Sequence, residues 1–357
     1  MTVRVLSIGT ATPRGRLTQG RTSDFGRAMA PSSVPEGVIE GLYRRTKIDR
    51  RGSVLIDPAT GAQTFYAQDA DGRGPGTAAR MAVYAREAAS LACEAGAGAI
   101  ARAKMSAASI THVVTVSCTG FESPGVDQML VRSLGLRASV GRTHIGFMGC
   151  HGALNGLAVA RALAAADANA VILLCCVELC SLHMHYGDRM DQLIANALFA
   201  DGAGAAIVAR SERAECPEVR ACRSWLAPDS ADLMSWRIGD HGFEMSLSPQ
   251  VPARLAAVVP GWMDAVLESC DPPLRRADVA GWAIHPGGAK IVEAVGEALG
   301  LGGDTTADSL AVLREHGNMS SPTVLFILDR MMQAGRARPW VAMAFGPGLA
   351  AEAVVFA

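Results

Sequence analysis

Three residues of the chain have side chains suited to acyl transfer: Cys150, His285 and Asn318. A cysteine thiolate can attack a thioester and hold the acyl group covalently. A neutral imidazole can take up or donate a proton, and a carboxamide N–H can stabilise an oxygen that gains negative charge. Together the three residue types indicate covalent catalysis through a thioester on Cys150.

Cys150 stands in GFMGCHGALNGL (146–157), between an apolar segment and a predicted helix. The positive partial charge at a helix N-terminus favours a thiolate, so we expect the pKa of Cys150 to be lowered. The flanking glycines permit a sharp turn and the close approach of a substrate carbonyl. Taken alone, the segment fits a buried core cysteine equally well.

His285 closes the predicted strand GWAIHP (281–286), and ligands of α/β proteins gather at such strand ends. Asn318 lies in a glycine-marked turn before a predicted helix that Ser320 or Ser321 can cap. An isolated histidine or asparagine in such a turn is more often structural. Three such residues at element ends in one chain favour a shared site.

The apolar periodicity predicts alternating helices and strands. The expected helices are 78–95, 124–134, 153–166, 290–299 and 321–334, and the expected strands are 111–117, 170–179, 205–209, 281–286, 340–345 and 352–357. Because the strands are continuously apolar, we expect covered, largely parallel sheets. The polar stretch 213–227, which contains Pro217, is the expected seam between two similar α/β lobes.

Composition excludes several classes of protein. The chain has 357 residues, half of them hydrophobic, with 33 basic and 34 acidic side chains, so neither nucleic-acid binding nor a polybasic membrane anchor is indicated. The longest apolar run, 170–177, is far shorter than the roughly twenty residues of a membrane span. The first residues show no export signal, and we expect a cytoplasmic protein. The nine cysteines form no CxxC pair, so neither disulfides nor a metal site is expected.

Nearly the whole chain resembles the chalcone synthase-like, or type III polyketide synthase, family. The matching segments are IGTATP (8–13), TGFESPGVDQML (119–130), MGCHGALNGL (148–157), ALFADGAGA (197–205), WAIHPGGAKI (282–291), GNMSSPTVLFIL (317–328) and FGPGL (345–349). The resemblance implies an α/β protein with the thiolase-like αβαβα layered fold and two related lobes. We place the lobe with the nucleophilic cysteine at 1–215 and the lobe with the catalytic histidine and asparagine at 216–357.

The resemblance also implies a reaction. Cys150 would accept an acyl starter from coenzyme A, while His285 and Asn318 would hold the malonyl thioester oxygen as carbon dioxide leaves. The resulting enolate would attack the Cys150 thioester, and the extended chain would cyclise, with an alkylpyrone, alkylresorcinol or related aromatic polyketide as the expected product. Family members are homodimers that use malonyl-CoA and acyl-CoA, without a tightly bound cofactor. The starter, the number of extensions and the ring closure are not fixed by the sequence, and both fatty and aromatic starters fit.

Several residues match pocket positions of the family. Phe199 matches the aromatic gatekeeper, Met245 replaces a second gatekeeper aromatic, and Trp236 stands where plant-type members carry glycine. The other expected pocket residues are Cys118, Thr119, Cys180, His183, Ser320 and Phe345. For the phosphates of coenzyme A, the cluster YRRTKIDRR (43–51) offers Arg44, Arg45 and Lys47. The segment 57–76 departs from plant-type sequences and is expected to border the entrance.

Other activities use the same residue types. An initiating ketoacyl-ACP synthase also combines cysteine, histidine and asparagine, but its histidine motif differs from HPGG and it takes malonyl groups from a carrier protein. A papain-like cysteine protease would carry its cysteine near the mature N-terminus in a different local signature. A non-catalytic scaffold would have no need of the intact three-residue set.

Overall fold

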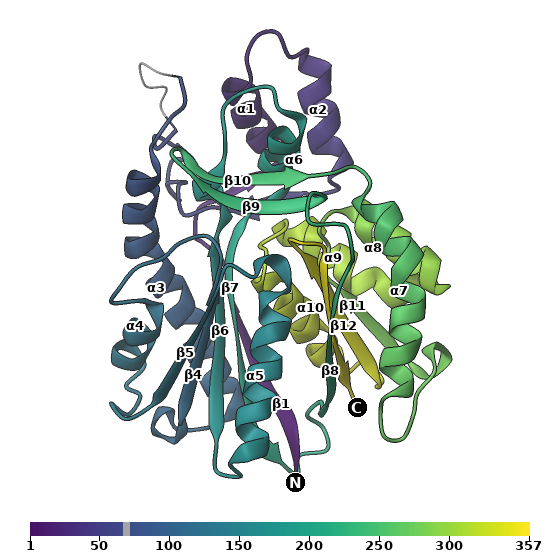
Figure 1. Cartoon of the computed structure of the whole chain (residues 1–357). Coiled ribbons are helices and arrows are strands. Elements are labelled where there is room, and N and C mark those ends of the chain that lie inside the picture. Colours follow the sequence, from purple (N-terminus) through teal and green to yellow (C-terminus); the bar gives the residue numbers. More distant parts are fainter. Residues whose placement is uncertain (67–71) are drawn as a thin grey trace.

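Two mixed β-sheets form the framework of the protein, seen in a computed structural model that describes residues 1–66 and 72–357 (Figure 1). Part of the expected entrance segment 57–76 therefore lies outside the described residues. The first sheet has the order β1 (Thr2–Ala11), β7 (Asp201–Ser211), β6 (Val171–Leu179), β4 (His112–Ser117) and β5 (Gly141–Gly146). The second has the order β11 (Gly281–Ile284), β12 (Trp340–Gly346), β13 (Ala350–Phe356) and β8 (Val219–Leu226).

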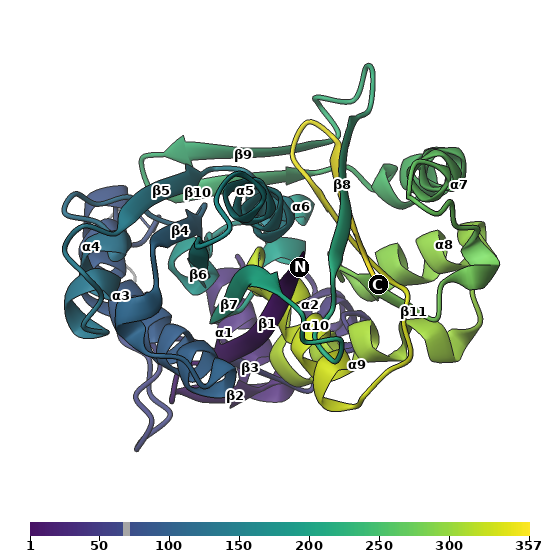
Figure 2. The same ribbon diagram turned by 90° about the horizontal axis from the view of Figure 1, so that it is seen from below.

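Helices lie between the sheets and on both outer faces (Figure 2). The central pair is α5 (Gly152–Ala166) and α10 (Pro322–Gln333), whose apolar side chains pack against both sheets. The outer face of the first sheet is covered by α3 (Thr77–Ala103) and α4 (Val126–Ser133). That of the second is covered by α7 (Val251–Glu268) and α8 (Ala289–Leu299). The layer order is therefore αβαβα, which confirms the predicted fold class.

Small residues allow α5 to pack closely on the first sheet. A Cβ on Gly156 would lie 2.5 Å from Leu174 Cδ1, and one on Gly152 would lie 2.7 Å from Val116 Cγ1. Any larger side chain would push the helix away from the sheet. Because α5 begins two residues after Cys150, this packing also fixes the position of that residue relative to the strands.

The expectation of largely parallel sheets was wrong. β4 runs parallel to β5 and β6, and β11 runs parallel to β12, whereas the remaining neighbours are antiparallel. The three-residue link between β12 and β13 is too short for a parallel crossover. A continuously apolar strand indicates that both faces of its sheet are covered. It does not indicate whether the neighbouring strands are parallel or antiparallel.

The seam between the lobes is narrower than predicted. Residues 219–226, inside the expected seam 213–227, form β8 and pair with β13. The link between the last strand of the first sheet and the first strand of the second is therefore only 212–218.

The remaining elements gather at one end of the two sheets, at the top of Figure 1. They are the helices α1 (Gln19–Met29), α2 (Glu36–Arg45) and α6 (Met190–Leu198), the short strands β2 (Arg16–Thr18) and β3 (Arg50–Gly52), and the hairpin β9 (Met234–Gly239) with β10 (Gly242–Leu247). The helix α9 (Ala307–His316) precedes the loop of Asn318. Among the described residues, no helix has both the length and the apolar character that a membrane span requires.

Candidate active site

Cys150 lies in a single 3-10 turn, Gly149–His151, that continues directly into α5. Gly149 has φ = 80°, and a Cβ at this position would lie 2.6 Å from Pro347 Cδ. Only glycine combines this backbone conformation with such a close contact. The sharp turn that the sequence suggested is therefore present, and it packs Gly149 against the loop between β12 and β13.

Burial raises the pKa of the Cys150 thiol to about 11, above its ordinary value of 9.0. The side chains of Ser320 and Asn318 act in the opposite direction and offset only part of this effect. The expectation of a lowered pKa was thus wrong, because loss of water around the thiol outweighs the groups that stabilise the thiolate. In the free enzyme the resting form of Cys150 is the protonated thiol.

Two backbone hydrogen bonds fix the position of Asn318. Its N–H donates to the Leu198 carbonyl at 3.1 Å, and its carbonyl accepts from the Ala200 N–H at 2.8 Å. The side-chain Oδ1 accepts from the Ser320 N–H at 2.8 Å, so the carboxamide is oriented with Nδ2 free to donate elsewhere. The Asn318 side chain also lowers the pKa of the Cys150 thiol, so the two side chains lie close together.

His285 directly follows β11, and its N–H donates to the Met343 carbonyl at 2.8 Å. Its ring is buried, and within the described part of the chain neither Nδ1 nor Nε2 has a hydrogen-bond partner. An unpaired buried polar group costs about 1–3 kcal/mol, which a ligand that bonds to it recovers. Burial, followed by the nearby His151, lowers the pKa of His285 to about 3, so the imidazole is neutral at physiological pH.

The strand β12 connects the surroundings of His285 and Cys150. It is the parallel neighbour of β11, and at its end Gly346 packs against the ring of His151 and Pro347 against Gly149. His285 therefore lies one strand away from the turn that carries Cys150. The carboxamide, the thiol and the free imidazole come from three separate loops.

A buried carboxylate, Glu178 of β6, fixes the surroundings of the thiol. It accepts hydrogen bonds from the Cys118 N–H at 2.9 Å, Thr119 Oγ1 at 2.8 Å and Ser321 Oγ at 2.6 Å. Burial raises its pKa, while these donors lower it. Glu178 thus joins the loop after β4 to the start of α10. In the sequence, Glu178 stands out as a single carboxylate inside an otherwise apolar strand. The role of Glu178 was not predicted.

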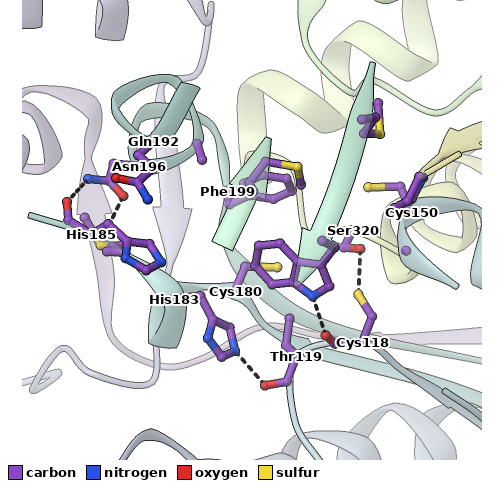
Figure 3. A pocket seen from close by; sticks show the side chains of 17 residues that line it. Cys118, Thr119, Cys150, Cys180, His183, His185, Gln192, Asn196, Phe199 and Ser320 are labelled. Atoms are coloured by element: carbon purple, nitrogen blue, oxygen red, sulfur yellow. Dashed lines mark hydrogen bonds between the residues drawn. The ribbon is translucent and has the colours of Figure 1, made fainter. Parts of the chain in front are cut away.

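A cavity opens beside Cys150 (Figure 3). Eight of the nine predicted pocket residues line it together with Cys150: Cys118, Thr119, Cys180, His183, Phe199, Trp236, Met245 and Ser320. The lining also includes residues that the sequence did not suggest: Gly149, Met184, His185, Gln192, Ala195, Asn196, Met234 and Pro347. Most of these belong to α6, to the hairpin or to the segment between β6 and α6, which the apolar periodicity did not reveal.

Phe345 is the exception among the predicted pocket residues. It points into the apolar core of the second lobe and is 4% exposed, because it lies within β12. Pro347, two residues later, lines the cavity in its place. The GPG turn therefore contributes to the cavity wall, but its phenylalanine does not.

Hydrogen bonds fix the positions of Trp236 and His183 in the cavity wall. Trp236 and Met245 are cross-strand partners in the hairpin, and the Trp236 indole N–H donates to the Cys118 carbonyl at 2.7 Å. His183 Nε2 donates to the Thr119 carbonyl at 2.7 Å, and its Nδ1 accepts from the Phe243 N–H at 2.9 Å. Burial lowers the pKa of His183 to about 3. With both ring nitrogens engaged, His183 is part of the wall and has no capacity for proton transfer.

The three predicted phosphate-binding cations lie apart from this cavity. Arg44 and Arg45 are exposed at the end of α2, and Lys47 follows them. Lys47 Nζ lies 2.6 Å from Glu293 Oε1 on α8, the helix that follows His285. Within residues 1–66 and 72–357, no group of three or more His, Cys, Asp or Glu side chains could hold a metal ion.

The raised pKa of Cys150 predicts a pH dependence of its alkylation. Because the pKa lies near 11, the reactive thiolate is a minor form at pH 7, and its fraction rises about tenfold per pH unit. The rate of Cys150 modification by iodoacetamide should therefore climb steadily from pH 7 to pH 10. Peptide mass spectrometry separates Cys150 from the other eight cysteines. A plateau below pH 8 would instead show that the thiol proton already resides on His285.

Two family models together match almost the entire chain. The model described as chalcone and stilbene synthases, N-terminal domain, matches residues 2–211, and the corresponding C-terminal domain matches residues 218–357. The "Alpha-pyrone synthesis polyketide synthase-like Pks18" of Mycobacterium tuberculosis is 31% identical over 366 residues, which cover 99% of this chain and 91% of the relative. The 3,5-dihydroxyphenylacetyl-CoA synthase of Streptomyces toyocaensis is 29% identical, with 98% and 88% covered.

Solved structures show the same likeness. PKS-I from the brown alga Ectocarpus siliculosus has a TM-score of 0.93 and 31% sequence identity, covering 99% of this chain and 98% of the other. The C-terminal type III polyketide synthase domain of "Steely1" from Dictyostelium has a TM-score of 0.91 and 26% identity, with 100% and 99% covered. The likeness extends over the complete length of both lobes.

Proposed function

Because the chain belongs to the chalcone and stilbene synthase family, the type III polyketide synthases, we propose that Cys150, His285 and Asn318 carry out its chemistry. The protein is an acyltransferase that condenses malonyl-CoA units in iterative decarboxylative steps. The observation that carries the assignment of roles is the Asn318 carboxamide, which Ser320 orients and which lowers the pKa of the nearby Cys150 thiol. His285 follows β11, whose parallel neighbour β12 leads to the loop that packs on the Cys150 turn, and neither ring nitrogen has a hydrogen-bond partner among the described residues.

Loading of the starter begins from the protonated thiol. The neutral imidazole of His285 takes the Cys150 proton, and the thiolate forms a bond to the carbonyl carbon of the acyl-CoA. The bond from that carbon to the coenzyme A sulfur then breaks, and the leaving thiolate receives the proton from the imidazolium.

Extension uses the same residues in a different role. When malonyl-CoA loses carbon dioxide, the electron pair of the broken C–C bond passes to the thioester oxygen and forms an enolate. An N–H of neutral His285 and Nδ2–H of Asn318 donate to that oxygen. The enolate carbon attacks the acyl carbonyl on Cys150, and the bond to sulfur breaks. Cys150 leaves as the thiolate, ready to accept the extended chain.

We assign the substrate pocket to the cavity beside Cys150. Phe199, Trp236, Met245, Cys118, Thr119, Cys180, His183 and Ser320 would contact the acyl chain. Family substrates are malonyl-CoA and acyl-CoA starters, and we propose that no cofactor is tightly bound. We propose an alkylpyrone, an alkylresorcinol or a related aromatic polyketide as the product. The name of the Mycobacterium tuberculosis relative, with α-pyrone synthesis in it, supports a pyrone for that protein and suggests one here.

We also propose that Arg44, Arg45 and Lys47 bind the phosphates of coenzyme A. Arg44 and Arg45 are exposed, and Lys47 lies beside α8, which begins shortly after His285. Lys47 would have to exchange Glu293 for a phosphate. Loss of these charges should then raise KM for malonyl-CoA and leave kcat unchanged.

A homodimer remains a prediction. β5 is an outer strand of the first sheet, and Phe121, Met129 and Met148 are exposed around it. An uncovered strand edge beside large apolar side chains is typical of a surface that another chain covers. Sedimentation equilibrium measures the particle mass, and the mass of one chain would contradict the dimer. The cytoplasmic location and the division of the lobes between residues 215 and 216 likewise stay predictions.

The proposed function is tested by supplying malonyl groups in two forms. We expect purified enzyme to convert malonyl-CoA with a panel of acyl-CoA starters to polyketides, detected by mass spectrometry. Malonyl-carrier protein should not be required. Strict dependence on the carrier protein would favour an initiating ketoacyl-ACP synthase, and peptidase activity without decarboxylation would favour a cysteine protease.

A further inference from the structure

Each extension takes up a proton that neither Cys150 nor His285 holds. Malonyl-CoA carries a carboxylate and loses it as neutral carbon dioxide, so its negative charge passes through the enolate to the Cys150 sulfur. When the extended chain returns to Cys150, the charge moves to the sulfur of the departing coenzyme A, which then takes a proton. Loading of the first starter differs, because there the Cys150 thiol is the proton source. His285 has no proton to add, since burial lowers its pKa to about 3.

A row of side chains crosses the second sheet from His285 to the edge strand β8. The register of β11 and β12 places His285, the residue after β11, beside Ala344 of β12. Ala344 pairs with Glu352 of β13, and Glu352 pairs with Ser224 of β8. His285 and Glu352 are thus two strand spacings apart, roughly 10 Å, with only the small side chain of Ala344 between them.

This row faces the layer of helices between the two sheets. On the same four strands, the residues two positions away pack in the core that contains α5 and α10: Ala283, Ala342, Val354 and Cys222. Because side chains alternate between the two faces of a strand, the row has the same orientation. It therefore faces the layer that begins with the turn of Cys150 and His151.

His151 packs over β12, the strand between those of His285 and Glu352. A Cβ on Gly346 of β12 would lie 2.9 Å from His151 Nε2, so the ring depends on the absence of a side chain there. Burial and then the nearby His151 lower the pKa of His285. Burial lowers the pKa of His151 itself, whereas its hydrogen bond to Asn155 and the charge of Glu352 raise it. His151 is therefore close to both ends of the gap.

The hydrogen bonds of His151 define which ring nitrogen can accept a proton. Its Nδ1 donates to Asn155 Oδ1 at 2.7 Å, so Nε2 carries the lone pair. His151 also lines a groove together with Glu352 and Ser224, which we call the side groove. Ser224 Oγ donates to Glu352 Oε2 at 2.7 Å and so holds the carboxylate in the wall of this groove. The imidazole thus has a basic nitrogen and a carboxylate neighbour on the route to solvent.

We propose that His151 carries protons from the side groove to His285, which passes them to the sulfur of the departing coenzyme A. Glu352 takes a proton from solvent and gives it to Nε2 of His151. The N–H bond of His151 then breaks, and a water molecule carries the proton to one ring nitrogen of His285. Neither nitrogen of His285 has a partner among the described residues, so one can accept this proton while the other donates its own. The net change is one proton from solvent for each extension.

This inference rests on the proposed function and adds a residue that acts through His285 without touching the substrate. It makes a distinction that a structural role of His151 does not make. Starter loading needs no proton from outside, whereas every extension needs one. Loss of the relay should therefore slow extension and leave loading unchanged.

The test is His151→Phe, which keeps an aromatic ring but cannot carry a proton. Acylation of Cys150 by the best acyl-CoA starter of the panel, followed in a single turnover by mass spectrometry of the intact protein, should change less than about twofold. We expect kcat for polyketide formation to fall by about tenfold or more, with KM for malonyl-CoA unchanged. His112→Phe is the matched control, because His112 lies at the start of β4, at the opposite end of that strand from the cavity residues Cys118 and Thr119.

Two further variants separate proton transfer from packing. His151→Ala leaves space for a free imidazole beside the side groove, and added imidazole should restore extension by this variant without accelerating the wild type. Glu352→Gln keeps an oxygen that can accept from Ser224 but cannot carry a proton. We expect Glu352→Gln to slow extension severalfold, again with loading unchanged.

The outcomes distinguish the relay from the function on which it rests. Unchanged extension in His151→Phe, or equal losses of loading and extension with no effect of imidazole on His151→Ala, would overturn the relay and leave the synthase intact. If the wild type neither loads a starter nor condenses malonyl-CoA, the proposed function fails and the relay fails with it. Should His151→Phe not fold, Glu352→Gln decides the question by the same comparison of loading with extension.

Discussion

Cys150→Ala should stop polyketide formation while slow decarboxylation of malonyl-CoA continues. Without the thiol the acyl starter has no covalent attachment, so the enolate has no acyl group to attack. We expect product formation to fall by a factor on the order of 10⁴ or more, the scale of losses seen when a catalytic nucleophile is removed. Decarboxylation persists because His285 and Asn318 still donate to the thioester oxygen.

Two measurements on the same samples check this expectation. Mass spectrometry of the intact protein after incubation with acyl-CoA should show an acyl adduct on the wild type and none on Cys150→Ala. Release of carbon dioxide from malonyl-CoA alone should remain detectable in both. Cys93→Ala is the matched control, because Cys93 is likewise half-buried but lies on α3, away from the cavity. Polyketide formation by Cys150→Ala at the wild-type rate would exclude this cysteine as the nucleophile.

The surroundings of Cys150 show how far its sequence context could lead. The turn was predictable, because Gly149 and Gly152 indicate a sharp bend before a helix that packs closely on the sheet. The direction of the pKa shift was not. Desolvation depends on how distant segments fold over the thiol, and the Asn318 and Ser320 side chains that partly offset it lie more than 160 positions further along the chain. The position of Cys150 at a helix N-terminus predicts only the local contribution to its pKa, not the effect of burial.

Other errors came from elements with weak apolar periodicity. The hairpin of Trp236 and Met245 has partly exposed residues on both strands, and α6 is short, so neither stood out in the sequence. Yet together they supply much of the cavity wall. Family resemblance identified Trp236 and Met245 as pocket residues without revealing that they are cross-strand partners. The family resemblance also placed Phe345 in the pocket. In the structure Phe345 lies within β12, and the alternation of side chains along the strand turns it into the core instead.

Replacement of His285 should impair both halves of the reaction. His285→Ala removes a donor to the enolate oxygen, and loss of one such donor lowers kcat by about 10²–10³. It also removes the base that takes the Cys150 proton, which matters because the thiol pKa is raised to about 11. Carbon dioxide release from malonyl-CoA and acylation of Cys150 in a single turnover should therefore both slow down.

His285→Gln separates the two roles. Glutamine keeps an N–H donor, so part of the decarboxylation rate should return, but it cannot accept the thiol proton, and acylation of Cys150 should stay slow. His112→Ala is the control, since His112 lies at the start of β4, at the opposite end of the strand from the cavity residues Cys118 and Thr119. Because burial holds the pKa of His285 at about 3, the imidazole is neutral from pH 5 upward, and wild-type decarboxylation should show no step from its titration between pH 5 and pH 9. Equal recovery of both rates in His285→Gln would mean that His285 acts only as a donor, and that the Cys150 proton leaves by another route.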